Sequence, residues 1–238
     1  MQTMVPIRIC NVANAHRDPY VAPGSGKRLK ERGMNIVCAL RRCVIGMALL
    51  LSFAMPAVAE AASPRVVVEK FYSSLLGAMQ EADKLGFDGR VQRLTPAIQE
   101  TFDTPAMART AVGPRWNAMT EGQREQVVEA FSRFVVATFA NRFDGYANEK
   151  FVVKGIIPTS DNNAMVVQSQ MLRSEGDPVT LNFVLRQAEG DAWRISDILF
   201  GAVSELANRR AEFTSVIRRD GVDGLISELN KKIKDLEQ

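Results

Sequence analysis

The stretch DPVTLNFVLRQAEGDAWRISDILF, from Asp177 to Phe200, contains two segments in which apolar and polar residues alternate, joined by the polar sequence AEGD. Alternation with a period of two predicts half-buried β-strands, and a short polar connection that contains glycine predicts a hairpin. Two further alternating segments precede this stretch, at residues 149–157 and 163–173. Together the four segments predict a four-stranded antiparallel sheet.

Helical patterns flank the predicted sheet on both sides. Apolar residues recur at helical spacing over 63–79 and 120–144, with shorter helical segments at 88–102 and 104–113. Two more helical stretches follow Gly201 and are separated by Gly221. Helices segregated from antiparallel strands indicate an α+β fold. A curved sheet packed with helices resembles the nuclear-transport-factor-like cone, here with an additional N-terminal helical part and C-terminal helices.

The N-terminal quarter of the chain is typical of a targeting segment. Residues 34–59 contain two arginines, an apolar run of 13 residues from Cys43 to Met55, and a small-residue cleavage sequence at 57–59. The run is shorter than the roughly 20 residues that span a bilayer. We therefore predict a cleaved signal peptide, with an uncleaved membrane anchor as the alternative. Residues 1–33 are predicted to be a disordered leader or a mis-assigned start, and residues 60–238 a single domain.

The charge and the reactive residues of the chain belong largely to this targeting segment. The whole chain carries a net charge of +3, but residues 60–238 contain 22 basic and 25 acidic residues. A nucleic-acid partner therefore loses its electrostatic argument. All three cysteines and the single histidine, His16, lie before residue 60. Without them the mature chain has no disulfide, no thiolate or histidine triad and no histidine-ligated metal, and we expect no cofactor.

Asp197 is an unusual residue because it falls where the inward apolar row of its strand should continue. A carboxyl group in an apolar cone can act as an acid-base catalyst, as in an isomerase-like enzyme. Alternatively it pairs with Arg194 or Arg209, or accepts hydrogen bonds from the main chain where the strand turns into the helix. We adopt the structural role, since buried acids are usually paired. Gly201 then allows the turn into the following helix.

The helix after Gly201 carries a dense set of charges. Arg209 and Arg210 lie at helical distances from Glu205 and Glu212, and two further arginines follow at 218 and 219. This spacing indicates a solvated, salt-bridged face. A docking surface for a partner or for lipid head groups is the alternative.

Several segments together resemble the MlaC family of periplasmic lipid-binding proteins. The resemblance covers nearly all of residues 64–236, through VVEKFYSSLL, RLTPAIQETFDTPAMARTAVGPRW, WRISDILFGAVSELANRRAEF and IRRDGVDGLISEL. Its most specific residues are Asp103, Met107, Arg109, Gly113, Trp116, Trp193, Asp197, Gly201, Ser204, Arg210, Phe213 and Gly221. The stretch GAMQEADKLGFDGRVQRL, residues 77–94, is longer than the general pattern and is similar to the hopanoid-associated HpnM branch.

This resemblance implies a soluble periplasmic carrier that holds a hopanoid or a phospholipid and shuttles it between the inner and outer membranes. It implies transient membrane contact, an inner-membrane lipid transporter as partner, an outer-membrane partner as a further option, and no enzymatic activity. The pocket would lie between the curved sheet and the helices. By apolar facing and resemblance, the expected walls are Leu75, Leu76, Met79, Phe131, Val135, Phe139, Phe183, Trp193 and Ile195. A non-catalytic interaction module with a solid core is the alternative.

Overall fold

The computed structural model describes residues 62–161 and 163–237. The predicted leader and signal peptide, with all the cysteines and the histidine, lie outside the described residues. Within the described part, helices and an antiparallel sheet confirm the predicted α+β fold.

Two helices open the described chain. α1 (Pro64–Gln80) has proline in its first turn, where the missing N–H costs no helical hydrogen bond. α2 (Ala82–Thr101) follows almost at once and is kinked at Gly86, whose φ of 61° is readily adopted only by glycine. α2 packs along α1 and reaches α4.

Two further helices lead to the sheet. α3 (Thr104–Val112) is capped by the Asp103 side chain, which accepts a hydrogen bond from the Ala106 N–H, and the short helix η1 (Gly113–Ala118) follows. α4 (Glu121–Arg142) begins with a capping box in which Thr120 and Gln123 each bond the other's main-chain N–H. The predicted segment 120–144 was therefore placed to within two residues at its C-terminal end.

The sheet is a meander of five strands in the order β1-β2-β3-β4-β5. Their bounds are β1 Lys150–Pro158, β2 Ala164–Leu172, β3 Val179–Gln187, β4 Trp193–Phe200 and β5 Val203–Ser204. The first four are the predicted strands. The fifth has only two residues, too few for a period to be read from the sequence, and it pairs with the end of β4 through a tight turn at Gly201, where φ is 62°.

A β-bulge in β4 changes the expected facing of Asp197. Leu185 pairs with Ile195, whereas its neighbour Val184 pairs with Asp197, so Ser196 is an extra residue without a partner of its own. Paired residues share a face, and an inserted residue shifts the strand by one position. Ile195 and Ile198 therefore belong to the buried row, and Asp197 leaves it. The expectation that Asp197 interrupts the inward row was wrong for this reason.

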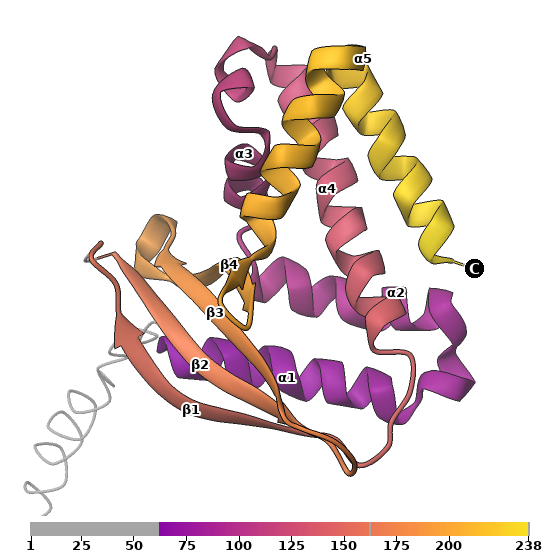
Figure 1. Cartoon of the computed structure of the whole chain (residues 1–238), viewed down its shortest axis with the longest axis vertical. Coiled ribbons are helices and arrows are strands. Elements are labelled where there is room, and N and C mark those ends of the chain that lie inside the picture. Colours follow the sequence, from indigo (N-terminus) through magenta and orange to yellow (C-terminus); the bar gives the residue numbers. More distant parts are fainter. Residues whose placement is uncertain (1–61, 162, 238) are drawn as a thin grey trace, which may run out of the picture. The chain divides into compact units, whose positions relative to one another are not determined.

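The last helix, α5 (Glu205–Leu236), has two halves separated by a kink at Gly221, where φ is 72°. The break falls where the sequence predicted it. Figure 1 shows the first half rising from the end of the sheet and the second half descending beside α4 to the C-terminus. α5 packs most extensively against α4 and also touches α3.

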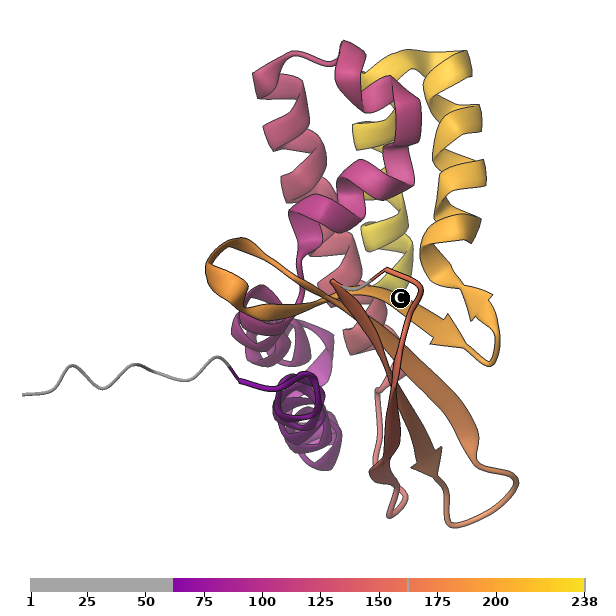
Figure 2. The ribbon, with the colours of Figure 1, turned by 90° about the vertical axis from the view of Figure 1, so that its left-hand side faces the viewer.

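The sheet curves around α1, which Figure 2 shows nearly end-on beside the strands. An aromatic cluster fills the space between them. The Phe71 ring lies 4.9 Å from the rings of Phe102 and Phe139 and 6.0 Å from that of Phe183, measured between centroids. Edge-to-face pairs of this kind add to the stability that burial supplies. The interior beneath the sheet is therefore packed protein.

One hydrogen-bonded group lies inside this apolar layer. The Tyr72 hydroxyl bonds Ser169 Oγ at 2.5 Å, and Ser169 in turn donates to the Leu181 carbonyl. Burial raises the pKa of Tyr72 far above its usual value, although the bond to Ser169 opposes the shift. The Tyr72 ring also stacks on Phe151 at 4.4 Å between centroids. The group ties α1 to β1 and β2 without leaving a buried polar atom unpaired.

Candidate functional site

An apolar cleft lies where α4, the end of β4 and the start of α5 meet. Its volume is about 50 Å³, well below the roughly 300–1,000 Å³ of typical small-molecule sites. A second hollow of about 280 Å³ adjoins it and shares Phe134, Thr138, Arg142 and Arg209. The cleft is lined by Met107, Phe131, Phe134, Val135, Thr138, Phe139, Arg142, Ile198, Phe200, Glu205, Leu206 and Arg209. In this closed arrangement, room for a large ligand requires α5 to move away from α4.

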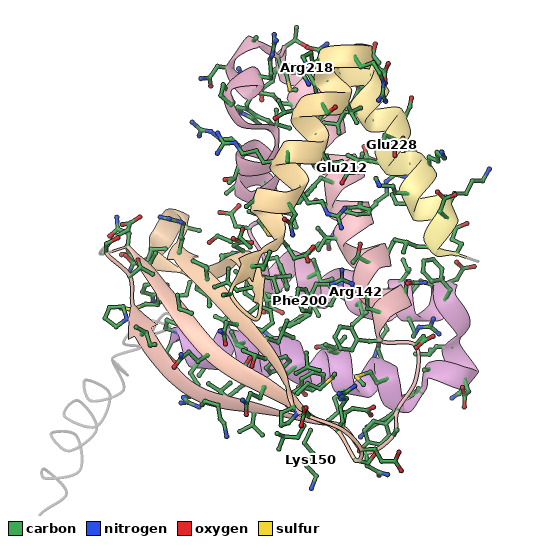
Figure 3. The ribbon with its side chains drawn as sticks, in the orientation of Figure 1. Arg142, Lys150, Phe200, Glu212, Arg218 and Glu228 are labelled. Carbon is green, nitrogen blue, oxygen red and sulfur yellow. The ribbon has the colours of Figure 1, made fainter. Side chains whose placement is uncertain are left out.

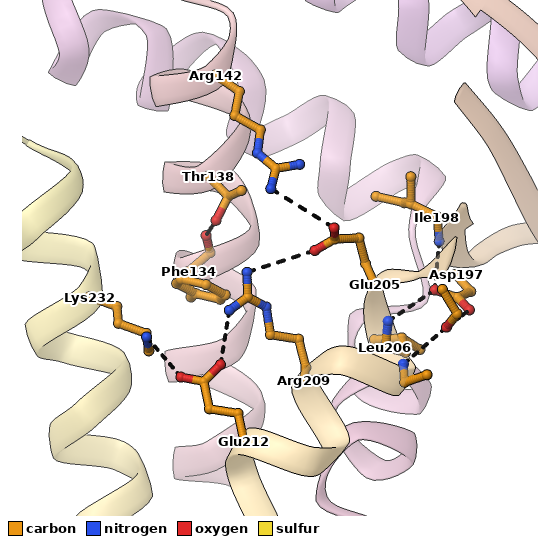
Figure 4. A network of polar contacts seen from close by, with 12 residues as sticks. Phe134, Thr138, Arg142, Asp197, Ile198, Glu205, Leu206, Arg209, Glu212 and Lys232 are labelled. Atoms are coloured by element: carbon orange, nitrogen blue, oxygen red, sulfur yellow. Dashed lines mark hydrogen bonds and ion pairs between the residues drawn. The ribbon is translucent and has the colours of Figure 1, made fainter. Parts of the chain in front are cut away.

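Charged side chains form a continuous series across the mouth of this cleft, which we call the ion-pair chain: Arg142, Glu205, Arg209, Glu212 and Lys232. Arg142 of α4 lies 3.9 Å from Glu205, which lies 3.7 Å from Arg209. Arg209 donates to Glu212 at 3.0 Å, and Lys232 approaches Glu212 to 2.8 Å. Figure 4 shows the series passing from α4 to both halves of α5. It therefore joins the elements that must separate for the cleft to widen.

Two aromatic rings support the arginines of this series. The Arg142 guanidinium lies 4.7 Å from the centroid of the Phe200 ring, and that of Arg209 lies 5.0 Å from the Phe134 ring. Cations at these distances are attracted to the ring face. The contacts place the polar mouth directly on the apolar lining, as expected of a site for an amphiphile.

Glu212 is the central carboxylate of the ion-pair chain. Partial burial is the largest single influence and acts to raise its pKa, but the hydrogen bonds from Lys232 and Arg209 together outweigh burial. The pKa of Glu212 is therefore lowered below its usual value. The ion-pair chain consequently stays charged under mildly acidic conditions.

Replacing Glu212 with glutamine should destabilise the fold at neutral pH but not at low pH. A carboxylate whose pKa is lowered by folding stabilises the protein above its unfolded pKa, and this stability is lost as the pH falls through the folded pKa. We expect Glu212→Gln to lower the free energy of unfolding by about 0.5–1 kcal/mol at pH 7, with the difference closing below about pH 4.5. Urea titrations between pH 3 and 7 measure it.

Glu129→Gln is the matched control, because Glu129 forms a 3.9 Å pair with Arg133 on the exposed face of α4. Its effect should be near zero at every pH. A Glu212→Gln difference that stays constant from pH 7 to pH 3 would contradict the role of the charge.

Asp197 lies beside the cleft and joins β4 to the start of α5. Its Oδ1 accepts from the N–H groups of Ile198, at 2.7 Å, and Leu206, at 3.2 Å, and its Oδ2 accepts from the Ser204 hydroxyl at 2.6 Å. Ser204 Oγ in turn accepts from the Ala207 N–H and so caps α5. This is the main-chain alternative that the sequence left open.

The arginine partners considered for Asp197 were wrong. Arg194 instead donates to the carbonyl groups of Gln99 and Glu100, both at 2.8 Å, near the end of α2. Arg209 belongs to the ion-pair chain. The bulge in β4 explains the difference, because it turns Asp197 toward the β4–α5 connection.

Metal chemistry and membrane spanning find no support in residues 62–161 and 163–237. No three histidine, cysteine, aspartate or glutamate side chains there are grouped so that they could hold a metal ion. In the same residues no helix has both the length and the apolar character needed to cross a bilayer.

Comparison with known proteins assigns the chain to a family. The model of the MlaC protein family matches residues 69–231, which is more than half of the chain. The chain belongs to the MlaC family. The MlaC binding protein of the intermembrane phospholipid transport system of Haemophilus influenzae is 21% identical over 122 residues, covering 50% of this chain. The alignment spans 57% of the length of that relative.

A solved structure shares the fold of this MlaC-family chain. It is the phospholipid-binding protein from Ralstonia solanacearum in complex with a phospholipid, with a TM-score of 0.66 and 21% sequence identity. The match covers 74% of this chain and all of that chain. At this identity the likeness concerns the fold.

The residues predicted as pocket walls fall into two groups in this MlaC-family chain. Phe131, Val135 and Phe139 of α4 line the cleft. The others do not: Leu75, Met79, Phe183 and Ile195 are buried in the core, Trp193 is partly buried against it, and Leu76 borders a separate surface hollow between α1 and β1.

Sequence reasoning missed much of the cleft lining. Phe134 shares the helical period of the predicted wall residues of α4, so periodicity could have included it. Ile198 and Phe200 could not be found in this way, because the bulge at Ser196 changes their facing. Arg142 and Glu205 meet only because α5 packs back on α4.

Proposed function

We propose that this protein is a periplasmic lipid carrier of the HpnM branch of the MlaC family, which holds a hopanoid or phospholipid and shuttles it between the inner and outer membranes. A cleaved signal at residues 34–59 would direct the chain to the periplasm, leaving residues 60–238 as one lipid-binding domain. An inner-membrane lipid transporter, and an outer-membrane partner as a further option, would load and unload it. Contact with the membranes themselves would be transient.

The observation that carries this proposal is the apolar cleft between α4 and α5 in a chain of this family. The curated relative and the structural neighbour are named for phospholipid transport and phospholipid binding, which supports a lipid as the ligand. The insertion at residues 77–94, which includes the Gly86 kink between α1 and α2, supports the HpnM branch. Phe131, Val135 and Phe139 would contact the apolar tails.

Energetics explains why such a cleft would be closed when empty. Burying one methylene group gains about 0.8 kcal/mol, so a 16-carbon chain gains about 12 kcal/mol, which corresponds to nanomolar binding. That gain exceeds the cost of breaking partly exposed ion pairs, at about 0–1 kcal/mol each. A lipid can therefore open the ion-pair chain, with Gly201 and Gly221 as hinges for α5. The same gain makes unaided release slow, so a partner would assist it.

The mature protein, purified without detergent and analysed by native mass spectrometry, should carry a lipid at about one molecule per chain. Mild organic extraction should release it and identify it as a hopanoid or a phospholipid. An empty protein that also fails to take up either lipid from vesicles would overturn the proposal.

A non-catalytic interaction module remains the second candidate, and the small volume of the cleft favours it. The same mass spectrum distinguishes the two, because a solid module carries no lipid. The isomerase-like alternative has no supporting observation, since both oxygens of Asp197 are engaged by the Ile198 and Leu206 N–H groups and by Ser204.

A further inference from the structure

Arg142 occupies a distinctive position at the last turn of α4. Its side chain lines both the apolar cleft and the adjoining hollow, and 41% of its surface is exposed. Figure 3 shows it directed toward Phe200 at the end of β4. The guanidinium therefore lies on the boundary between the apolar lining and solvent, where the head of a bound amphiphile would lie.

The hydrogen-bonding capacity of Arg142 is unused within the part of the chain that the structure describes. Its one charged contact there is Glu205 at 3.9 Å, which is too long for a hydrogen bond. Glu205 is shared with Arg209, which lies slightly closer at 3.7 Å. Arg209, by contrast, donates to Glu212 at 3.0 Å. Arg142 is thus the arginine of the ion-pair chain whose charge is least neutralised.

We propose that Arg142 binds the phosphate of a phospholipid head group, which takes the place of Glu205 as its counter-ion. This inference rests on the proposed function and selects between its two lipid classes. A planar guanidinium forms two parallel hydrogen bonds with a phosphate, a stronger contact than its long and partly exposed pair with Glu205. The Phe200 ring, 4.7 Å away, holds the guanidinium at the mouth while the acyl chains pass Phe131 and Val135.

A hopanoid makes a different demand on this site. Its polycyclic body suits the apolar lining, but a head that carries only hydroxyl groups brings no anion to replace Glu205. The Arg142–Glu205 pair would then remain, and Arg142 would contribute little to affinity. The chemistry of the mouth therefore favours phospholipids over uncharged polycyclic lipids of equal apolar area.

The test compares two lipids with the same tails, dioleoyl phosphatidylglycerol and dioleoylglycerol, each delivered to the mature protein from cyclodextrin. We expect wild-type protein to bind the phosphate-bearing lipid about tenfold more tightly, the effect of one charged hydrogen-bonding contact. Arg142→Gln should remove this preference and leave the affinity for dioleoylglycerol unchanged. Inorganic phosphate should not displace the lipid, because it gains nothing from the apolar cleft.

Two further variants distinguish phosphate binding from a purely structural role. Arg133→Gln is the matched control, since Arg133 is also on α4 and also forms a 3.9 Å pair with a glutamate, but lies away from the cleft. It should retain the tenfold preference. Glu205→Gln removes the competing anion, so its preference for the phosphate-bearing lipid should be equal or greater.

The outcomes separate the inference from the proposed function. If Arg142→Gln weakens both lipids equally, or Glu205→Gln loses the preference as well, Arg142 serves only to close the cleft and the inference is wrong. It is equally wrong if inorganic phosphate competes with the lipid. If wild-type protein binds neither lipid and carries no hopanoid, the proposed function itself fails. Circular dichroism of each variant establishes that it is folded.

Discussion

Replacing Phe183 with alanine is expected to lower the free energy of unfolding by about 3–5 kcal/mol. Phe183 lies on β3 and is completely buried, with its ring centroid 6.0 Å from that of Phe71 and 5.6 Å from that of Tyr72. Truncation removes apolar contacts and leaves a cavity that the rigid aromatic cluster cannot fill. Equilibrium unfolding in urea, with the midpoint and slope fitted separately, measures the loss.

The result decides between core and pocket wall. Val184→Ala is the control, because Val184 is the next residue of the same strand, is only partly buried and has a smaller side chain, and it should cost clearly less. A loss below about 1 kcal/mol for Phe183→Ala, combined with loss of bound lipid, would instead place Phe183 in the pocket wall that the sequence predicted. The structure favours the core role.

Replacing Asp197 with alanine should lower the free energy of unfolding by about 1–3 kcal/mol. The substitution removes the acceptor for the N–H groups of Ile198 and Leu206 and the partner of the Ser204 hydroxyl. These groups join β4 to the first turn of α5, so the loss should also loosen α5 over the cleft. Urea unfolding measures the stability, and hydrogen exchange of the first turns of α5 measures the loosening.

Asp197→Asn is the graded control for this prediction. Asparagine keeps the Oδ1 acceptor in place but loses the negative charge and presents an NH₂ group to Ser204, so we expect a smaller loss. A loss under about 0.5 kcal/mol for Asp197→Ala would show that the cap is dispensable. If stability stayed intact while a chemical turnover disappeared, the enzyme interpretation would replace the structural one.

The local elements were predictable because their signals lie close together in the chain. The capping box of Thr120 and Gln123 marks the start of α4, and Pro64 marks that of α1, since capping involves residues within one turn of each other. The four alternating segments predicted β1 to β4 because side chains of a strand alternate between its two faces. Gly221 predicted the break in α5, where only glycine readily adopts the positive φ.

The candidate site was only partly predictable, because periodicity identifies a buried face but not what it packs against. Phe139 and Phe183 have the same apolar character, yet Phe139 borders the cleft and Phe183 lies inside the aromatic core. The difference arises from how α4, the sheet and α5 meet, which involves contacts between residues distant in sequence. The bulge at Ser196 is likewise set by the pairing of β3 with β4.

The sequence by itself determined the α+β class, the order and most of the bounds of the elements, and the family resemblance. Each of these depends on local spacing or on residue identity. Only the tertiary structure decided that the volume beneath the sheet is filled, that the cleft lies between α4 and α5, and that Arg142 meets Glu205 at its mouth. The physical reason is that cavities and ion pairs are set by small differences in how separate elements pack, which no single segment encodes.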